Sequence, residues 1–198
     1  MPWLTRVCRR YDLTLLYAAA VTVTSVVVAV QPPEVVREAV AQSSTNLANM
    51  RSRPLSVLAL SAFVVSPAWQ LVLLVPVVAA YGAVQRWLGR SGLVVVVVLG
   101  HVGATLAVMA MEITALYRHI ARFDIVVKPD VGVSYGLAAA LGVLLAAVPR
   151  RWRTAYGLGS LLVVAAQLVL ARDFTSLGHT VAWLIGLGLA LLVSRTRA

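Results

Sequence analysis

The chain has 198 residues, of which 61% are hydrophobic and only 12% are charged, and its mean hydropathy is +0.90. Soluble domains carry about 25% charged residues, so this composition excludes an ordinary soluble protein. The single cysteine, Cys8, excludes a disulfide scaffold. The formal net charge of +10 comes from short basic clusters between apolar runs. That distribution is typical of membrane topology and argues against a nucleic-acid partner.

Motifs that would hold a cofactor or a metal ion are missing from the sequence. No glycine-rich phosphate-binding motif follows a strand pattern, which argues against dinucleotide and P-loop enzymes. One cysteine and three scattered histidines, His101, His119 and His179, do not form a zinc motif. We therefore expect no metal and no cofactor. Arginine far outnumbers lysine, and alanine, valine and leucine dominate, which indicates a bacterial source with a GC-rich genome.

Apolar runs long enough to cross a bilayer recur along the chain. The first run follows three arginines and is long for a signal peptide without a clear cleavage site, so we predict an uncleaved helix. Residues 55–88 are too long for one helix, and Ser66-Pro67 divides them into an embedded loop segment, 55–66, and a span. In lipid each isolated segment must be helical to satisfy its backbone. The predicted spans are residues 13–30, 68–88, 93–116, 131–148, 155–171 and 177–194.

These spans make the whole chain, residues 1–198, a single all-α membrane domain of six helices. Cytoplasmic loops carry the excess of arginine and lysine, and an N-terminus inside gives the inner loops more basic residues than the outer loops. It also puts five of the seven acidic residues outside. We predict a multi-pass protein of the inner (plasma) membrane, surrounded by lipid bilayer, with both termini in the cytoplasm.

A serine and a histidine are predicted at matching depth in two parallel spans. Spans 131–148 and 177–194 both run inward, and Ser134 and His179 lie near their starts. A Ser–His pair is the minimum for nucleophilic catalysis, because the imidazole takes the hydroxyl proton and returns it to the leaving group. The alternative is that Ser134 only hydrogen-bonds a backbone carbonyl, as serines in membrane helices commonly do.

The same two spans carry small residues at four-residue spacing, which lets membrane helices approach closely. We therefore expect the two helices to touch and to bring Ser134 within reach of His179. The small residues are Gly132, Gly136 and Ala140 in the first span and Gly178, Ala182, Gly186 and Ala190 in the second.

Three further polar residues need an explanation. His101 and Glu112 share nearly one face of span 93–116 but lie roughly 16 Å apart along its axis. Three interpretations are open for this pair. The two residues form a polar seam that faces Ser134, or they line an ion pathway of a small transporter. The third is that they make interhelical hydrogen bonds that fix the packing. The lack of clear inverted repeats argues against the transporter. We expect Asp130 to complement the dipole of the span that follows it; orienting the site is the alternative.

At these residues the sequence resembles the rhomboid family of intramembrane serine proteases, over about residues 54–194. GVSYG (132–136) resembles the Gly-x-Ser motif, and GHTVAWLIG (178–186) resembles the histidine motif. GAVQRWLGRSG (82–92) is similar to the inner end of the family's second span, with Gln85 where glutamate is usual. LSAFVVSPAWQ (60–70) is similar to the family's membrane-embedded loop. The resemblance implies a Ser134 nucleophile, a His179 general base, an outward-facing water-filled cavity and transmembrane helices as substrates.

The sequence departs from the family where the oxyanion is held. The family's second span usually carries a histidine and, four residues later, an asparagine, but here these positions fall on Trp69 or Gln70 and on a leucine. Losing an oxyanion donor commonly costs about 2.7–4 kcal/mol of transition-state stabilisation. Gln70 and the backbone N–H of Ser134 are the candidate substitutes, and Gly132 is expected to support the site.

Two more departures lie beside the proposed dyad. Tyr135 follows the serine where a small residue is common, and Ala182 replaces a glycine three residues after the histidine. These changes fit a divergent protease that cleaves transmembrane substrates. They also fit a pseudoprotease, which would bind transmembrane clients without cutting them.

Overall fold

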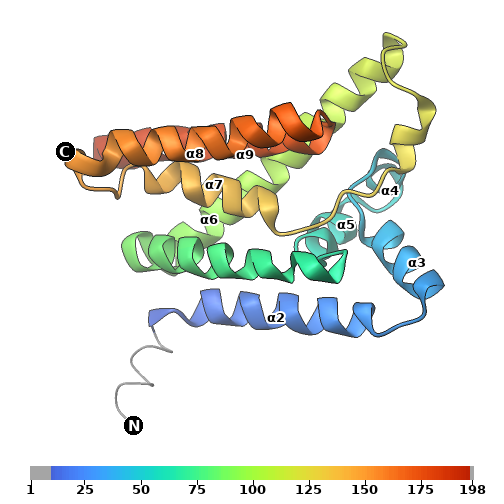
Figure 1. Cartoon of the computed structure of the whole chain (residues 1–198), viewed down its shortest axis with the longest axis horizontal. Helices are drawn as coiled ribbons and strands as arrows, with labels where there is room; N and C mark the ends of the chain where they lie inside the picture. The colour runs from blue at the N-terminus through green and yellow to red at the C-terminus, as the bar shows by residue number, and fades with distance from the viewer. Residues whose placement is uncertain (1–9, 197–198) are drawn as a thin grey trace.

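The computed structural model describes residues 10–196, and within that range all regular structure is helical (Figure 1). Four helices are long and apolar enough to cross a membrane: Asp12–Ala29, Ala68–Tyr117, Arg150–Ala171 and Phe174–Arg195. The expected all-helical membrane class is thus confirmed for the described residues. The elements are α2 (Asp12–Ala29), α3 (Pro33–Ser43), α4 (Leu47–Ser52), α5 (Pro54–Ser61), η1 (Ala68–Leu73), α6 (Leu74–Tyr117), η2 (Phe123–Val127), α7 (Ser134–Leu144), α8 (Arg150–Ala171) and α9 (Phe174–Thr196).

The longest helix, α6, is folded back on itself. Gly89 interrupts it with φ 78° and ψ −178°, a backbone conformation that favours glycine. The first leg, residues 74–88, and the second leg, residues 90–117, run in different directions (Figure 1). The two spans expected at 68–88 and 93–116 therefore belong to one helical segment with a sharp turn between them.

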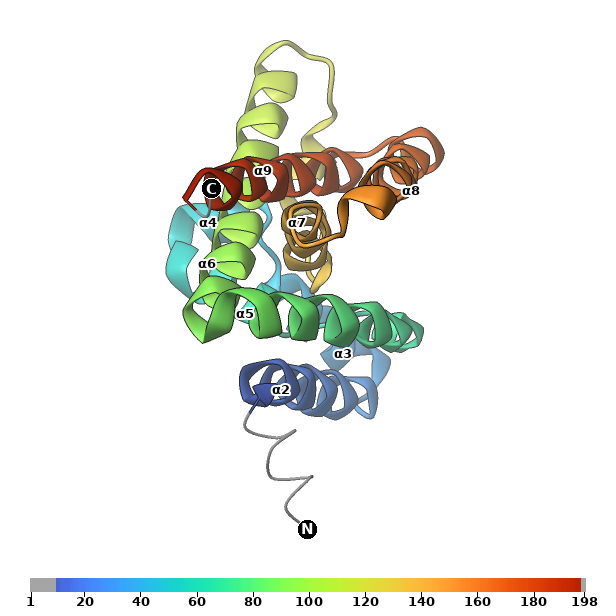
Figure 2. The same cartoon turned by 90° about the vertical axis from the view of Figure 1, so that its left-hand side faces the viewer.

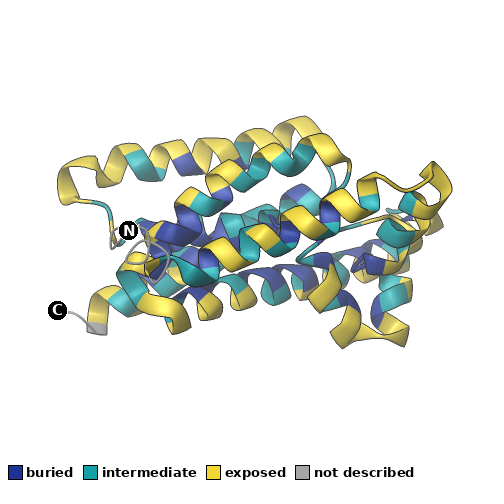
Figure 3. Ribbon diagram, turned by 90° about the horizontal axis from the view of Figure 1, so that it is seen from below, coloured by how far each residue is buried: buried dark blue, intermediate teal, exposed yellow. Residues whose placement is uncertain are grey.

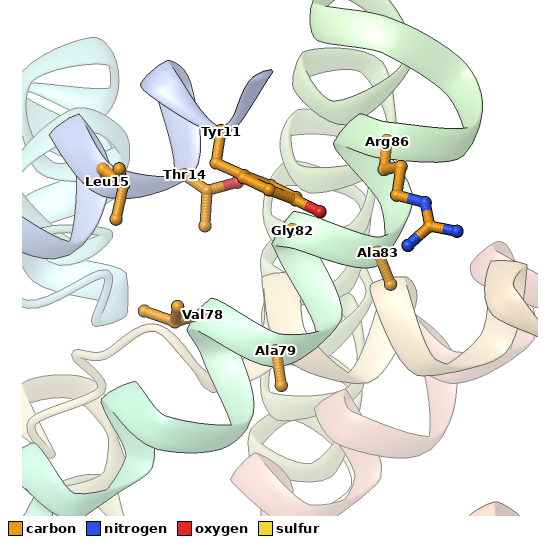
Figure 4. A pocket seen from close by; sticks show the side chains of 8 residues that line it. All are labelled: Tyr11, Thr14, Leu15, Val78, Ala79, Gly82, Ala83 and Arg86. Carbon is orange, nitrogen blue, oxygen red and sulfur yellow. The ribbon is translucent and has the colours of Figure 1, made fainter. Parts of the chain in front are cut away.

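Helix α2 packs along the first leg of α6 through a polar contact. The Gln85 Oε1 atom accepts hydrogen bonds from the Thr14 backbone N–H at 3.0 Å and the Thr14 hydroxyl at 2.7 Å. The Gln85 amide donates to Asp12 at 2.8 Å, and Asp12 also pairs with Arg90. One turn away, the Tyr11 ring lies against Gly82 (Figure 4).

Replacing Gln85 by leucine should destabilise the protein by about 1–3 kcal/mol, because the buried Thr14 hydroxyl loses the acceptor that it has on α6. Thermal unfolding in mild detergent measures the effect, and Gln167→Leu, at an exposed position of α8, is the matched control. Adding Thr14→Val to Gln85→Leu should recover most of the loss. Equal melting temperatures for Gln85→Leu and Gln167→Leu would contradict this account.

Helix α7 lies at the centre of the bundle, in contact with α6, α8 and α9 (Figure 2). It has only 11 residues, about 16 Å at 1.5 Å per residue. It begins at Ser134, three residues later than expected, because Gly132 adopts a φ of 134° that a helix does not allow. Ser134 is therefore the first residue of a short, central helix.

Glycines allow α7 and α9 to pack with their backbones in contact. A Cβ atom on Gly186 would lie 2.1 Å from the Ala139 carbonyl oxygen, and one on Gly142 would lie 2.3 Å from the Trp183 carbonyl oxygen. The expected close approach of these helices is present, but Gly136 does not take part in it. A Cβ on Gly136 would instead meet the Tyr81 hydroxyl of α6 at 2.2 Å.

Exposed residues follow the outward faces of the long helices (Figure 3), and many of them are large and apolar. On α8, Leu162 is 70% exposed and Leu170 is 83% exposed, and Val30 after α2 is 72% exposed. Exposing so much apolar surface to water is unfavourable, whereas contact with lipid tails is not. The outer surface is therefore suited to a lipid bilayer.

Candidate functional site

Ser134 lines a very small pocket, with a cavity volume of about 10 Å³, between α6, α7 and the loop before α4. Its side chain is partly buried, and within residues 10–196 no hydrogen bond engages its hydroxyl. Because a helix leaves its first N–H groups without intrahelical partners, the backbone of Ser134 presents donors here. The residues that line the pocket are Thr45, His101, Asp130, Val131, Gly132, Ser134 and Tyr135.

His179 lies near the start of α9, and its imidazole is held without a hydrogen bond. Both ring nitrogens are buried and have no partner in the described part of the chain. The ring packs edge-on against Tyr135, with 5.2 Å between centroids and 66° between planes. Gly178 makes room for this contact, since a Cβ there would lie 2.5 Å from the Tyr135 hydroxyl.

The starts of α7 and α9 are thus adjacent, and Tyr135, the neighbour of Ser134, supplies a ring contact with the imidazole. No hydrogen bond joins Ser134 to His179 among the described residues. Ser134 and His179 are each the immediate sequence neighbour of a residue in the Tyr135–Gly178 contact. The geometry therefore brings the two helix ends together and leaves both proposed dyad side chains unpaired.

Asp130 is the centre of a hydrogen-bond network beside Ser134. Its carboxylate accepts from the Tyr135 hydroxyl at 3.0 Å, from Thr45 at 3.3 Å and from Thr175 at 3.4 Å. Its backbone N–H donates to Ser44 at 2.7 Å, and its carbonyl accepts from Thr45. Burial raises the pKa of Asp130 above its usual value, while the three hydroxyl donors oppose that rise.

The two residues expected to support the oxyanion lie in different places. Gly132 lines the pocket, and its N–H donates to the Ser61 carbonyl at 2.9 Å. Gln70 lies in η1, where its N–H donates to Pro67, and it does not line the Ser134 pocket. Ala182, one turn after His179, is completely buried in α9.

Of the expected polar seam, only His101 reaches the Ser134 pocket. Its Nε2 atom lies 3.1 Å from the Ser61 hydroxyl and 3.0 Å from the Leu58 carbonyl oxygen, so it ties α6 to α5. Glu112 is buried on the same helix, and within residues 10–196 no ion pair or hydrogen bond connects it to His101. In the same range no cluster of three or more His, Cys, Asp or Glu side chains could hold a metal ion.

Sequence reasoning missed the hydroxyl residues that surround Asp130: Ser44, Thr45 and Thr175. Ser44 and Thr45 belong to the polar run QSSTN, which the hydropathy pattern identifies only as a loop. Their role depends on contacts with a residue far away in the chain, and no local pattern encodes such contacts. In the structure the four consecutive polar residues from Ser43 to Asn46 are all buried, which sets this segment apart from a solvated loop.

Comparison with known proteins gave one match. A family model described as rhomboid-like protein matches residues 6–198, which confirms the resemblance that the serine and histidine motifs indicate. No curated protein and no solved structure matches the chain.

Proposed function

The chain belongs to the family of rhomboid-like proteins, and on this premise we propose that it is an intramembrane serine protease acting on transmembrane helices. The proposed spans are α2, the two legs of α6, α7, α8 and α9, in the inner membrane. The start of α2, the turn at Gly89, the α7–α8 turn and the end of α9 lie at one end of the bundle (Figure 1). This supports two cytoplasmic termini, and cleavage would then occur near the outer face.

The observation that carries the proposal is the unpartnered imidazole of His179. A buried polar group without a hydrogen bond costs about 1–3 kcal/mol, and native structures rarely retain one without a functional reason. His179 has two such atoms, beside a helix start that carries a free serine hydroxyl. An imidazole that must accept a proton during catalysis is a physical reason to keep these nitrogens unpaired.

In the proposed reaction, rotation of the two side chains lets Ser134 donate its proton to His179. Ser134 Oγ attacks the scissile carbonyl carbon, and the resulting oxyanion collapses to break the C–N bond. The imidazolium returns its proton to the leaving amine. Water then attacks the acyl-enzyme, gives a proton to His179, and the serine oxygen leaves with that proton as the second product is released.

Backbone donors at the start of α7 are our candidates for holding the oxyanion. Gln70 lies outside the pocket, so the usual second-span donors have no side-chain substitute there. The N–H of Ser134 has no acceptor among the described residues, and the helix dipole favours negative charge at this end. With backbone donors alone, we expect a lower rate of catalysis than in an enzyme whose side chains also donate to the oxyanion.

The second candidate is a pseudoprotease that binds transmembrane helices without cutting them. The packing of Tyr135 against His179 favours it, because an aromatic ring lies against the imidazole that the serine would have to reach. A binding protein would retain the bundle and would not need Ser134. The two candidates therefore differ in their dependence on this residue.

Fluorophosphonate labelling of the purified protein in mild detergent tests the proposal. Wild type and the control Ser52→Ala, at an exposed position of α4, should be labelled. Ser134→Ala and His179→Ala should lose the label. A folded wild type that stays unlabelled beside an active rhomboid protease would establish the pseudoprotease, and labelling that survives Ser134→Ala would identify a different nucleophile.

A further inference from the structure

We propose that Asp130 is a positioning residue, which holds the His179 imidazole in place through the hydroxyl and ring of Tyr135. This inference rests on the proposed protease function. It gives Asp130 a role in the reaction although, within residues 10–196, no hydrogen bond joins its carboxylate to Ser134 or His179.

The first step is the contact between Asp130 and Tyr135. The Tyr135 hydroxyl donates to Asp130 Oδ2 at 3.0 Å, across the first turn of α7. Tyr135 itself is only 4% exposed, so the phenol is confined by packing as well as by this bond. A buried tyrosine hydroxyl needs a partner, and the carboxylate fixes the direction in which the ring points.

The second step is the contact between Tyr135 and His179. Neither imidazole nitrogen has a hydrogen bond in the described part of the chain, so packing alone sets the orientation of the His179 ring. The edge-on contact with Tyr135, at 5.2 Å between centroids, is the aromatic contact that it makes. Movement of the Tyr135 ring would therefore change the direction of the imidazole nitrogens.

The third step is the anchoring of Asp130 itself. Thr45 and Ser44, from the loop before α4, bind its backbone and carboxylate, and Thr175 of α9 approaches its second oxygen at 3.4 Å. The aspartate thus joins two segments, the loop before α4 and the start of α9, beside the start of α7. An ion pair between Lys128 and Asp173, at 3.5 Å, adds a link between the segment that carries Asp130 and the residue just before α9.

A purely structural role makes a different prediction from a positioning role. If Asp130 only stabilises the helix start, its loss should lower the melting temperature without changing the environment of His179. If it positions the imidazole, loss of the Tyr135 hydroxyl alone should have the same catalytic effect as loss of the carboxylate. Asp130→Asn should keep the wild-type labelling rate, because the amide oxygen can still accept the hydrogen bond from the Tyr135 hydroxyl.

The experiment combines labelling kinetics with histidine NMR on the full chain in detergent, using Tyr135→Phe, Asp130→Ala and Asp130→Asn. Asp124→Ala, at an exposed aspartate of η2 in the same connection between α6 and α7, is the matched control. The rate of fluorophosphonate labelling at saturating probe is measured together with the apparent probe affinity. The ring protons of His179, assigned with His179→Ala, report on its contact with the Tyr135 ring.

Tyr135→Phe and Asp130→Ala should lower the saturating rate by ~10–100-fold, as small misplacements of catalytic groups do, with unchanged probe affinity and shifted His179 signals. Asp130→Asn and Asp124→Ala should resemble wild type in both measurements. An unchanged rate in Tyr135→Phe, or unmoved His179 signals in both impaired variants, would overturn the inference. If wild type is never labelled, the protease function and this role fail together, whereas a labelled wild type with the wrong variant pattern defeats only the positioning role.

Discussion

The Gly186→Ala variant is expected to fold poorly and to lose labelling of Ser134. The added Cβ would lie 2.1 Å from the Ala139 carbonyl oxygen and 3.0 Å from the Gly142 Cα. Both are backbone atoms, so no side-chain rotation relieves the overlap and α9 must move away from α7. Overpacking of a well-packed core costs about 1–3 kcal/mol and sometimes more, and a clash between two backbones belongs at the upper end of that range.

The same helix provides the control. Gly188 is exposed, and a Cβ there meets no atom within 4 Å. Alanine is favoured over glycine inside a helix by about 1 kcal/mol, so Gly188→Ala should match or exceed the stability of wild type. Yield of monodisperse protein and thermal unfolding in detergent compare the two variants. Equal behaviour of Gly186→Ala and Gly188→Ala would contradict the close packing of α7 and α9.

Loss of this packing also predicts loss of function in the protein that does fold. Ser134 and His179 lie at the starts of α7 and α9, so any separation of these helices increases the distance between the two side chains. The labelling rate of the folded fraction of Gly186→Ala should therefore fall together with its melting temperature. Lowering the temperature should not restore it.

Small-residue spacing predicts that these two helices touch, but not which residues meet. Gly136 and Gly142 both lie on α7, and only Gly142 faces α9, while Gly136 faces Tyr81 of α6. A helix at the centre of a bundle has small residues on more than one face. A pattern along the sequence identifies such faces without assigning a partner to each of them.

The position of Ser134 shows a second limit of sequence reasoning. Hydropathy predicts a span at residues 131–148, yet the helix covers only Ser134–Leu144. The positive φ of Gly132 and the bonds that Asp130 makes with Ser44 and Thr45 hold the preceding segment out of helical conformation. These bonds join segments that are distant in sequence, and hydropathy carries no information about them.

The sequence identifies polar residues that are unusual within an apolar run. It does not reveal their roles, because these depend on partners that are distant in the sequence. His101 and His179 are both conspicuous in apolar runs, but nothing local distinguishes them. In the structure His101 bonds to α5, whereas His179 has no hydrogen-bond partner among the described residues. Our proposal that His179 is the general base rests on that difference, which one substitution made at both positions can test.

Replacing His179 by leucine should abolish labelling of Ser134 and also stabilise the protein. General-base catalysis contributes about 10²–10⁴-fold, so the labelling rate should fall by at least that factor. Leucine is close to histidine in size and has no polar atoms, so the variant no longer buries two unpaired nitrogens. Each such group costs about 1–3 kcal/mol, and the melting temperature in detergent should therefore rise.

His101→Leu is the matched comparison and should change stability in the opposite direction. There leucine removes the contacts of Nε2 with the Ser61 hydroxyl and the Leu58 carbonyl oxygen, and hydrogen bonds of this kind stabilise by about 0.5–1.5 kcal/mol each. If His179 is kept for catalysis, its unpaired ring lowers stability. The melting temperature should then rise for His179→Leu and fall for His101→Leu. A fall in both variants would mean that His179 is held by polar contacts after all, and the argument for a reserved general base would lose its foundation.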